Sequence, residues 1–299
     1  MTYLWEALWN NRIVLAFFMS QKRIMVVDGG STKCHWLVFG AGPDVEFTSG
    51  GVNPLMVQAS QLTAEWEALF RGREVGRVDE VAYYGAGCIG GPANEKVARA
   101  LESVTGCGAV TVESDIVGAA RATLGHEEGI ACILGTGCNS CLYDGRKVVA
   151  NVPPLGFILG DEGSGADIGR AVVAAALKGL LKERLTREFW EFAGEDYRSI
   201  ISRVYSQPRA NAYLANFARF AASHLDDESV VTLVSRRLGE FLSRNVMLYD
   251  RAQGLPVGFV GGVAKSFEPL LRRACEAKGV SVKVVVADPT EGIRRFHEG

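Results

Sequence analysis

The segment DGGSTK, residues 28–33, combines residue types that suit the binding of phosphate. An acid ends a short apolar run, two glycines let the backbone approach a ligand, and two hydroxyls and an ammonium group follow. Backbone N–H groups and hydroxyls can hold phosphate oxygens, and the Asp28 carboxylate can bind Mg²⁺ through water. A plain hairpin turn would need the same glycines, so this segment alone leaves both interpretations open. The expected phosphate-binding residues are Gly29, Gly30, Ser31, Thr32 and Lys33.

The segment LGTGCNS, residues 134–140, repeats this chemistry at a second turn. Two such turns in one chain are more specific for a nucleotide than one. The chain has no G-x-x-x-x-G-K-[ST] sequence and no strand followed by G-x-G-x-x-G and a helix, which excludes a P-loop and a Rossmann turn. The residues expected to contact phosphate here are Gly135, Thr136 and Gly137.

The segment GFVGGVAKSF, residues 258–267, joins a strand to a helix through paired glycines. Their bare backbone offers a flat surface on which an adenine or ribose could lie. Simple packing of the helix against the strand is the alternative explanation. The residues expected at this nucleotide contact are Gly261, Gly262, Val263 and Ala264.

Carboxylates follow two further glycine-rich or strand-end segments. Asp115 closes the strand-like run VTVES and is the residue we expect to act as general base, although aspartate there could equally cap the following helix. Asp161 and Glu162 lie in the loop LGDEGSGADIG before a long helix. They could bind sugar hydroxyls, or they could complement the helix dipole.

The hydrophobic pattern predicts which elements position these residues. Apolar runs at residues 24–28 and 36–40 predict a hairpin, and the pattern of strand, glycine turn and strand restarts at residues 130–150. We therefore expect two α/β units of similar design, over residues 23–125 and 126–299, with the ligand cleft between them. Helices are expected at residues 55–70, 94–104, 116–124, 164–187, 197–204, 210–224, 228–250 and 264–278.

Composition narrows the class of protein. The 299 residues are 48% hydrophobic and 22% charged, which is typical of a globular protein. Because 32 basic residues nearly balance 34 acidic ones, we expect no nucleic-acid partner. Seven cysteines, an odd number, favour reduced thiols and a cytoplasmic location, and one C-x-x-C at Cys138 and Cys141 is weak support for a metal site.

The leading residues 1–22 are set apart from this pattern. Their uncharged run over residues 13–20 is far shorter than the roughly 20 residues that span a bilayer, so we expect no membrane helix. No signal peptide is expected either, because a small-residue cleavage site is lacking. Two explanations stay open, an upstream extension before a natural start at Met19 and a packing helix.

Taken in order, DGGSTK, GGVNP, GAG, ESD, GTGCNS, GDEGSGADIGR and GFVGGVA resemble the BadF/BadG/BcrA/BcrD-type ATPase family and its N-acetylglucosamine kinase-like branch. The resemblance covers residues 24–292 and implies an α/β fold of duplicated actin-like (ribonuclease H-like) ATPase domains, with a central cleft and a helical insertion in the second domain. It also implies ATP, Mg²⁺ and phosphorylation of a sugar at a primary hydroxyl. Asp115 matches the family's base, and the positions that match sugar contacts are Asn53, Asn139, Ser140 and Asp161.

Two positions depart from the family pattern: Cys138 replaces the usual serine after G-T-G, and Ile293 stands where a small residue is common. The cysteine motif of the iron–sulfur activases is not found. We therefore predict an ATP-dependent kinase for the 6-hydroxyl of N-acetylglucosamine or a related amino sugar. N-acetylmuramate kinase, glucosamine kinase and an ATPase that drives a partner protein are the alternatives, and whether the protein is a homodimer stays open.

Overall fold

The computed structural model describes residues 22–30 and 32–299. The predictions for residues 1–21 and for Ser31 lie outside these residues. The chain divides into two compact units, the first ending at Gly118 and the second beginning at Ala119. This division precedes the boundary expected after residue 125, and it falls inside the helix α4 (Asp115–Leu124).

The first unit is built on a five-stranded sheet with the order β3-β2-β1-β4-β5. Strands β1, β2 and β3 are antiparallel neighbours, whereas β4 and β5 continue the sheet in parallel with β1. The aromatic side chain of Trp36 lies between Trp66 and Phe47 in the core of this unit. The elements are β1 (Arg23–Gly29), β2 (Lys33–Gly40), β3 (Val45–Gly50), α2 (Ala59–Phe70), β4 (Glu80–Gly85), α3 (Gly91–Thr105) and β5 (Val110–Ser114).

The second unit repeats this sheet. Its strand order β10-β9-β6-β7-β8 has the same pattern, with an antiparallel meander of the first three strands and two later strands added in parallel. The two predicted hairpins are therefore β1–β2 and β6–β7. The strands are β6 (Glu128–Leu134), β7 (Cys138–Asp144), β8 (Val148–Val152), β9 (Pro256–Val260) and β10 (Ser281–Val286).

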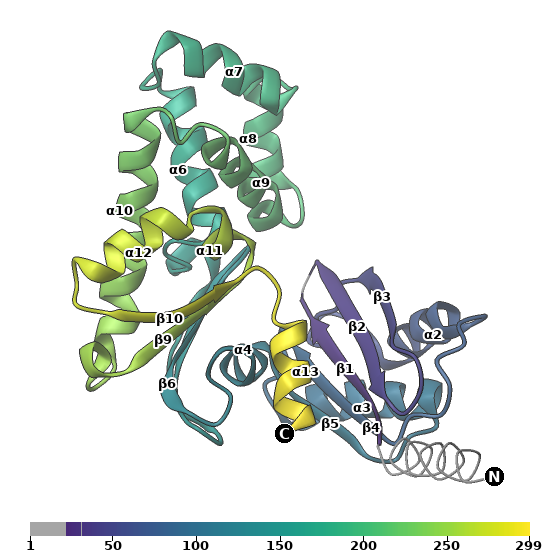
Figure 1. Cartoon of the computed structure of the whole chain (residues 1–299). Helices are drawn as coiled ribbons and strands as arrows, with labels where there is room; N and C mark the ends of the chain where they lie inside the picture. Colours follow the sequence, from purple (N-terminus) through teal and green to yellow (C-terminus); the bar gives the residue numbers. More distant parts are fainter. Residues whose placement is uncertain (1–21, 31) are drawn as a thin grey trace, which may run out of the picture. The chain divides into compact units, whose positions relative to one another are not determined.

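Helices inserted between β8 and β9 distinguish the second unit from the first. Figure 1 shows α6 to α9 gathered beyond one end of the sheet. Three of the inserted helices, α6, α8 and α10, begin at a side-chain cap, because Ser164, Asp196 and Asp227 each accept a backbone N–H there. The inserted helices are α5 (Gly156–Leu159), α6 (Gly165–Leu177), α7 (Glu183–Ala193), α8 (Tyr197–Ser206), α9 (Ala210–Ala222) and α10 (Glu228–Arg244). The helices α11 (Gly262–Ser266) and α12 (Glu268–Glu276) lie between β9 and β10, and α13 (Thr290–Glu298) follows β10.

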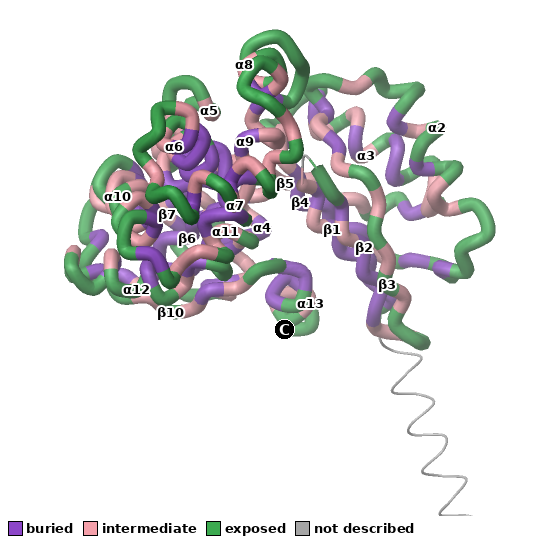
Figure 2. Tube along the Cα trace, turned by 90° about the horizontal axis from the view of Figure 1, so that it is seen from above, coloured by how far each residue is buried: buried purple, intermediate pink, exposed green. Residues whose placement is uncertain are grey.

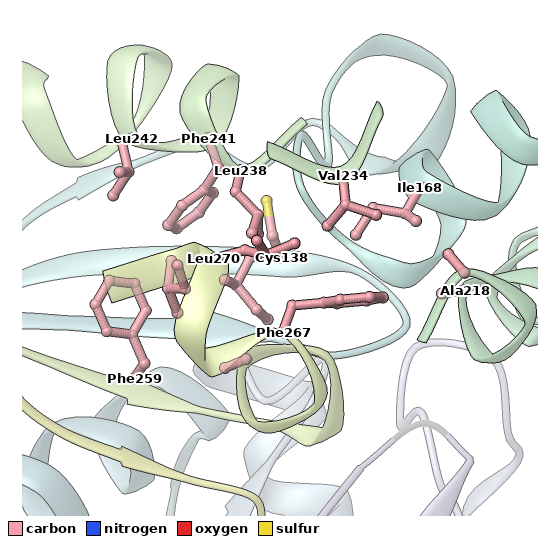
Figure 3. Packing of buried hydrophobic residues seen from close by; sticks show 14 of the residues in the cluster. Cys138, Ile168, Ala218, Val234, Leu238, Phe241, Leu242, Phe259, Phe267 and Leu270 are labelled. Carbon is pink, nitrogen blue, oxygen red and sulfur yellow. The ribbon is translucent and has the colours of Figure 1, made fainter. Parts of the chain in front are cut away.

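The core of the second unit joins its sheet to these helices. Figure 3 shows Leu238 and Phe241 of α10 facing Leu270 of α12, with Phe259 of β9 below them. Buried residues run along the central strands of each unit, and exposed ones mark the outer turns (Figure 2). Among the helices that the structure describes, none is long and apolar enough to cross a membrane.

Some predicted helix limits were wrong. The helix expected from Leu55 starts at Ala59, because the preceding residues form a hydrogen-bonded turn at Asn53. The helix expected over 164–187 ends at Leu177, two residues before Gly179, which has a φ of 67°. The helix expected over 264–278 is two helices, α11 and α12, that meet at Phe267.

Candidate active site

Strand ends in the first unit bring three loops to one edge of its sheet. The parallel strands β1, β4 and β5 are in register at Gly29, Gly85 and Ser114, so the segments that follow them start at the same level. A backbone hydrogen bond of 2.8 Å from Ala86 N to Gly29 O joins the first two of these segments. Carboxyl ends of parallel strands are the usual place for a ligand in α/β sheets.

The first glycine turn lies directly on the core. A Cβ at Gly29 would stand 2.3 Å from the hydroxyl oxygen of Tyr83, and a Cβ at Gly30 would stand 2.8 Å from the carbonyl oxygen of Lys33. Packing alone therefore requires glycine at both positions. Asp28 is half-buried at the end of β1, and the side chain of Lys33 is exposed. The turn thus presents a carboxylate and a cation at the sheet edge.

Asn53 connects this turn with the loop after β4. Its Oδ1 accepts a 3.0 Å hydrogen bond from Leu55 N, and Val52 N donates to Gly30 O at 3.2 Å. The left-handed Gly87, with a φ of 79°, lies so close that a Cβ there would be 2.4 Å from Asn53 Oδ1. The GGVNP segment is consequently held against both glycine turns of this unit.

Asp115 begins α4 at the same edge. Its Oδ1 accepts a 2.8 Å hydrogen bond from Ile116 N, and burial raises the pKa of its carboxyl above the ordinary 3.8. The neighbouring Cys88 thiol has a pKa raised to about 12, first by burial and then by the charge of Asp115. Asp115 thus bonds the helix start and also lies beside the loops that carry Asn53 and Gly87.

The second glycine turn, residues 135–137, is closed and braced by backbone bonds. Gly135 N donates to Gly137 O at 3.0 Å. The first residues of α6 donate to the same turn, Gly165 N to Gly135 O at 2.8 Å and Ala166 N to Thr136 O at 3.1 Å. The carbonyl groups of the turn therefore take up the first amides of α6, which fixes the turn against the start of this helix.

Asp161 holds this turn from the side. Its buried carboxylate accepts a 3.1 Å hydrogen bond from Cys138 N, and burial raises its pKa above the ordinary value. Its backbone is left-handed, with a φ of 55°, and Ser164 rather than Asp161 caps α6. The carboxylate at this position therefore has a structural partner that the sequence did not reveal.

Ion pairs fix the rest of this loop to α10. Glu162 pairs with Arg244 at 3.1 Å, and the buried Asp167 lies 3.5 Å from Arg237 and accepts from Arg170 at 2.6 Å. Loss of Glu162 would remove the ion pair with Arg244, whereas Arg237 would keep a second acidic partner, Glu240 at 2.8 Å, if Asp167 were lost.

The two polar residues after the turn lie differently from one another. Asn139 is partly exposed, and its Oδ1 accepts hydrogen bonds of 2.9 Å from Ser140 N and from Asn151 Nδ2. Ser140 is 0% exposed, and its Oγ lies 2.8 Å from the hydroxyl of Tyr249. The interior position of Ser140 gives its hydroxyl no surface that a sugar could reach in this structure.

The paired glycines after β9 complete the set in the second unit. Gly261 has a φ of 124°, and a Cβ there would be 2.2 Å from the carbonyl oxygen of Leu134, so the end of β6 and this loop are in direct backbone contact. Gly262 is exposed, and a Cβ there would have no atom within 4 Å, whereas Ala264 is fully buried. Open backbone at Gly262 is the surface that a flat ligand could contact.

The structure assembles the sequence-predicted residues in two sets, one in each unit. The first comprises Asp28, the following turn, Asn53 and Asp115, and the second comprises the turn at 135–137, Asp161 and the glycines at 261–262. Sequence reasoning missed Gly87 and the first amides of α6. The GAG segment after a strand was a signal for Gly87, but the bonds from Gly165 and Ala166 depend on tertiary contacts.

Comparison with solved structures places the chain among known folds. A proposed N-acetylglucosamine kinase from Porphyromonas gingivalis is 40% identical to it with a TM-score of 0.87, covering 92% of this chain and 98% of that one. The chain belongs to the same family as that protein. No protein-family model and no curated protein matches the sequence.

More distant structures share the fold alone. A proposed N-acetylglucosamine kinase from Chromobacterium violaceum is 20% identical, with a TM-score of 0.68, and covers the same shares of the two chains, 92% and 98%. A ROK family glucokinase from Streptomyces griseus, solved with glucose and AMPPNP, is 17% identical, with a TM-score of 0.59 and again 92% and 98% coverage. The predicted α/β fold of duplicated actin-like kinase units is confirmed.

Proposed function

We propose that the protein is an ATP-dependent carbohydrate kinase that phosphorylates the 6-hydroxyl of N-acetylglucosamine or a related amino sugar. The observation that carries the proposal is the 40% identity, over nearly the whole length of both chains, to a proposed N-acetylglucosamine kinase. The order of the chain's motifs, which resembles the BadF/BadG-type ATPases, supports the same activity.

In this proposal the second unit binds most of the nucleotide. The turn at residues 135–137 contacts phosphate through its backbone, and the bare backbone at Gly261 and Gly262 contacts the adenosine. In the first unit, the backbone of the turn after Asp28, with Thr32 and Lys33, contacts phosphate. The positive φ and close contact at Gly261 require a residue without a side chain, and the open position at Gly262 leaves its backbone accessible to a ligand.

Asp28 is the residue that would hold Mg²⁺. Among the described residues, no group of three or more His, Cys, Asp or Glu could hold a metal ion by itself. One carboxylate such as Asp28 can be enough for Mg²⁺, because this ion commonly uses one or two carboxylates together with water and substrate phosphates. When bound, Mg²⁺ neutralises negative charge on the phosphates.

Asp115 would accept the proton of the sugar's 6-hydroxyl. A carboxylate with a raised pKa is a better base near neutral pH than an ordinary one, provided that it stays ionised. Asn53, on the turn that packs against Gly87, would bond a sugar hydroxyl. Asp161 and Asn139 stay proposed sugar contacts, and burial leads us to leave Ser140 out.

The test is ATP consumption with product mass, measured with glucose, glucosamine, N-acetylglucosamine and N-acetylmuramate. Wild type should give one preferred sugar phosphate, and Asp115→Ala should give none while keeping the circular dichroism of the folded protein. ATP hydrolysis at the same rate with and without every sugar would refute the kinase proposal and favour an ATPase that drives a partner protein. A product only from glucosamine or N-acetylmuramate would replace the preferred substrate.

A further inference from the structure

Three exposed apolar side chains stand at the candidate site of the first unit. Leu55 is 56% exposed, Met56 85% and Ile89 76%. Within the described part of this unit, they are the large apolar side chains classed as exposed, and all three lie in the turns that adjoin Asn53 and Asp115. Exposed apolar surface concentrated beside a site commonly marks contact with a ligand.

The two turns that carry these side chains touch each other. Gly87 packs against the side chain of Asn53 so closely that a Cβ would be 2.4 Å from Asn53 Oδ1 and 3.3 Å from a ring carbon of Pro54. Leu55 is two residues after Asn53 in the sequence, and Ile89 is two residues after Gly87, so both lie close to this contact. The exposed apolar residues therefore lie on two turns whose backbones are neighbours.

Hydrogen bonds hold both turns in place. Lys96 of α3 donates to the carbonyl oxygens of Pro54 and, at 2.6 Å, of Val57, which spans the turn that carries Met56. Ile89 N donates to Gly87 O at 3.1 Å. The intervening Cys88 is buried next to Asp115. The exposure thus belongs to an ordered surface beside the proposed base.

We propose that Leu55, Met56 and Ile89 form an apolar wall that contacts the acyl group on the substrate's nitrogen and so selects N-acylated sugars over sugars with a free amine. The inference rests on the proposed function and specifies its substrate class. Burial of an acyl methyl group against this wall is favourable, because apolar surface is removed from water. The basic amine of glucosamine would lose its hydration there without gaining a hydrogen-bond partner, which is unfavourable. Because Met56 and Ile89 are largely exposed, the wall leaves room for chains longer than acetyl.

The experiment compares kcat/KM for glucose, glucosamine and the N-acetyl, N-propionyl and N-butyryl derivatives of glucosamine. One buried methyl or methylene group corresponds to about a fourfold change. Wild type should prefer N-acetylglucosamine to glucosamine and accept the propionyl and butyryl forms at least as well as the acetyl form. The double variant Met56→Gln/Ile89→Gln should lose about fourfold or more on each acyl sugar and keep its kcat/KM for glucose.

The matched control is Leu180→Gln, which replaces another exposed leucine, 72% exposed, in the second unit between α6 and α7. This variant should leave the ratio of kcat/KM for each acyl sugar to that for glucose unchanged. An unchanged ratio of N-acetylglucosamine to glucose in the double variant would overturn the wall, and so would a sharp loss of activity on going from acetyl to propionyl. A change in oligomeric state in the double variant alone, by light scattering, would instead make this surface a contact between two copies and also overturn the proposal.

Failure of the proposed function gives a different result. If wild type phosphorylates none of the sugars, calorimetric titration with the same acyl series still measures the wall. Binding that strengthens with acyl length and weakens in the double variant supports the inference without kinase activity. If no sugar binds, both the proposed kinase function and the proposed apolar wall are refuted.

Discussion

Replacing Gly262 by alanine should weaken ATP binding without destabilising the protein. No atom lies within 4 Å of the position that the new methyl group would occupy, so the substitution meets no clash within the chain. Gly262 is the first residue of α11, where alanine is the better helix former by up to about 1 kcal/mol. For a unit of this size, that gain corresponds to a melting temperature raised by at most about 2–4 °C.

The expected loss is one of affinity for the nucleotide and not of protein stability. If adenosine lies on the bare backbone at this position, the methyl group enters its contact surface and overpacking costs about 1–3 kcal/mol, or roughly 5- to 150-fold in the Kd for ATP. Thermal unfolding with and without ATP, together with KM for ATP in a coupled assay, measures both effects. An unchanged KM for ATP with an unchanged melting temperature would refute the reasoning, since the methyl group would then face empty solvent.

The adjacent glycine is the matched control. Gly261→Ala would place its methyl group 2.2 Å from Leu134 O at a φ of 124° that alanine rarely adopts. Strain of this kind costs about 1–3 kcal/mol before any clash is counted, so the melting temperature should fall in the absence of ATP. If Gly261→Ala is as stable as wild type, the described contact between the end of β6 and this loop is wrong.

The remaining predictions concern four other positions. Asp115→Asn should lower kcat by about 10²- to 10⁴-fold in steady-state kinetics with both KM values retained. Because the base must be deprotonated and burial raises its pKa above 3.8, wild-type kcat/KM should fall with decreasing pH through a pKa above that value, and this acid limb should be missing in Asp115→Asn. Asp161→Ala leaves the buried N–H of Cys138 without its acceptor and should lower the free energy of unfolding in urea by about 1–3 kcal/mol. Asp161→Asn should lose less, because it keeps an acceptor oxygen and asparagine tolerates the left-handed backbone. Equal losses of unfolding free energy in the two variants would contradict the hydrogen bond. Gly169→Ala would set a methyl group 1.8 Å from a carbonyl oxygen of α9 and should prevent stable packing of α6, while Gly239→Ala, with open space around it, should be neutral or stabilising.

The sequence by itself predicted the features that depend on neighbouring residues. Alternating apolar runs around glycine turns located both hairpins, and the recurrence of this pattern at residue 130 indicated the duplicated α/β design. The position of Asp115 after a strand placed it at a sheet edge, because a strand must end where its hydrophobic run ends. Helix limits were less certain, since a single turn at Asn53 or a glycine such as Gly179 stops a helix that its apolar spacing would continue.

The tertiary structure alone decided which polar residues are accessible. Asn139 and Ser140 are adjacent in sequence and chemically similar, yet one lies at the surface and the other in the interior, where it meets Tyr249 at a separation of 109 residues. Asp161 pairs with the backbone of Cys138, 23 residues earlier, rather than capping the helix that follows it. Such contacts depend on how β7, the Asp161 loop and the segment after α10 pack together. Local periodicity carries no information about them, because each side chain has the same neighbours along the chain whether or not its distant partner is present.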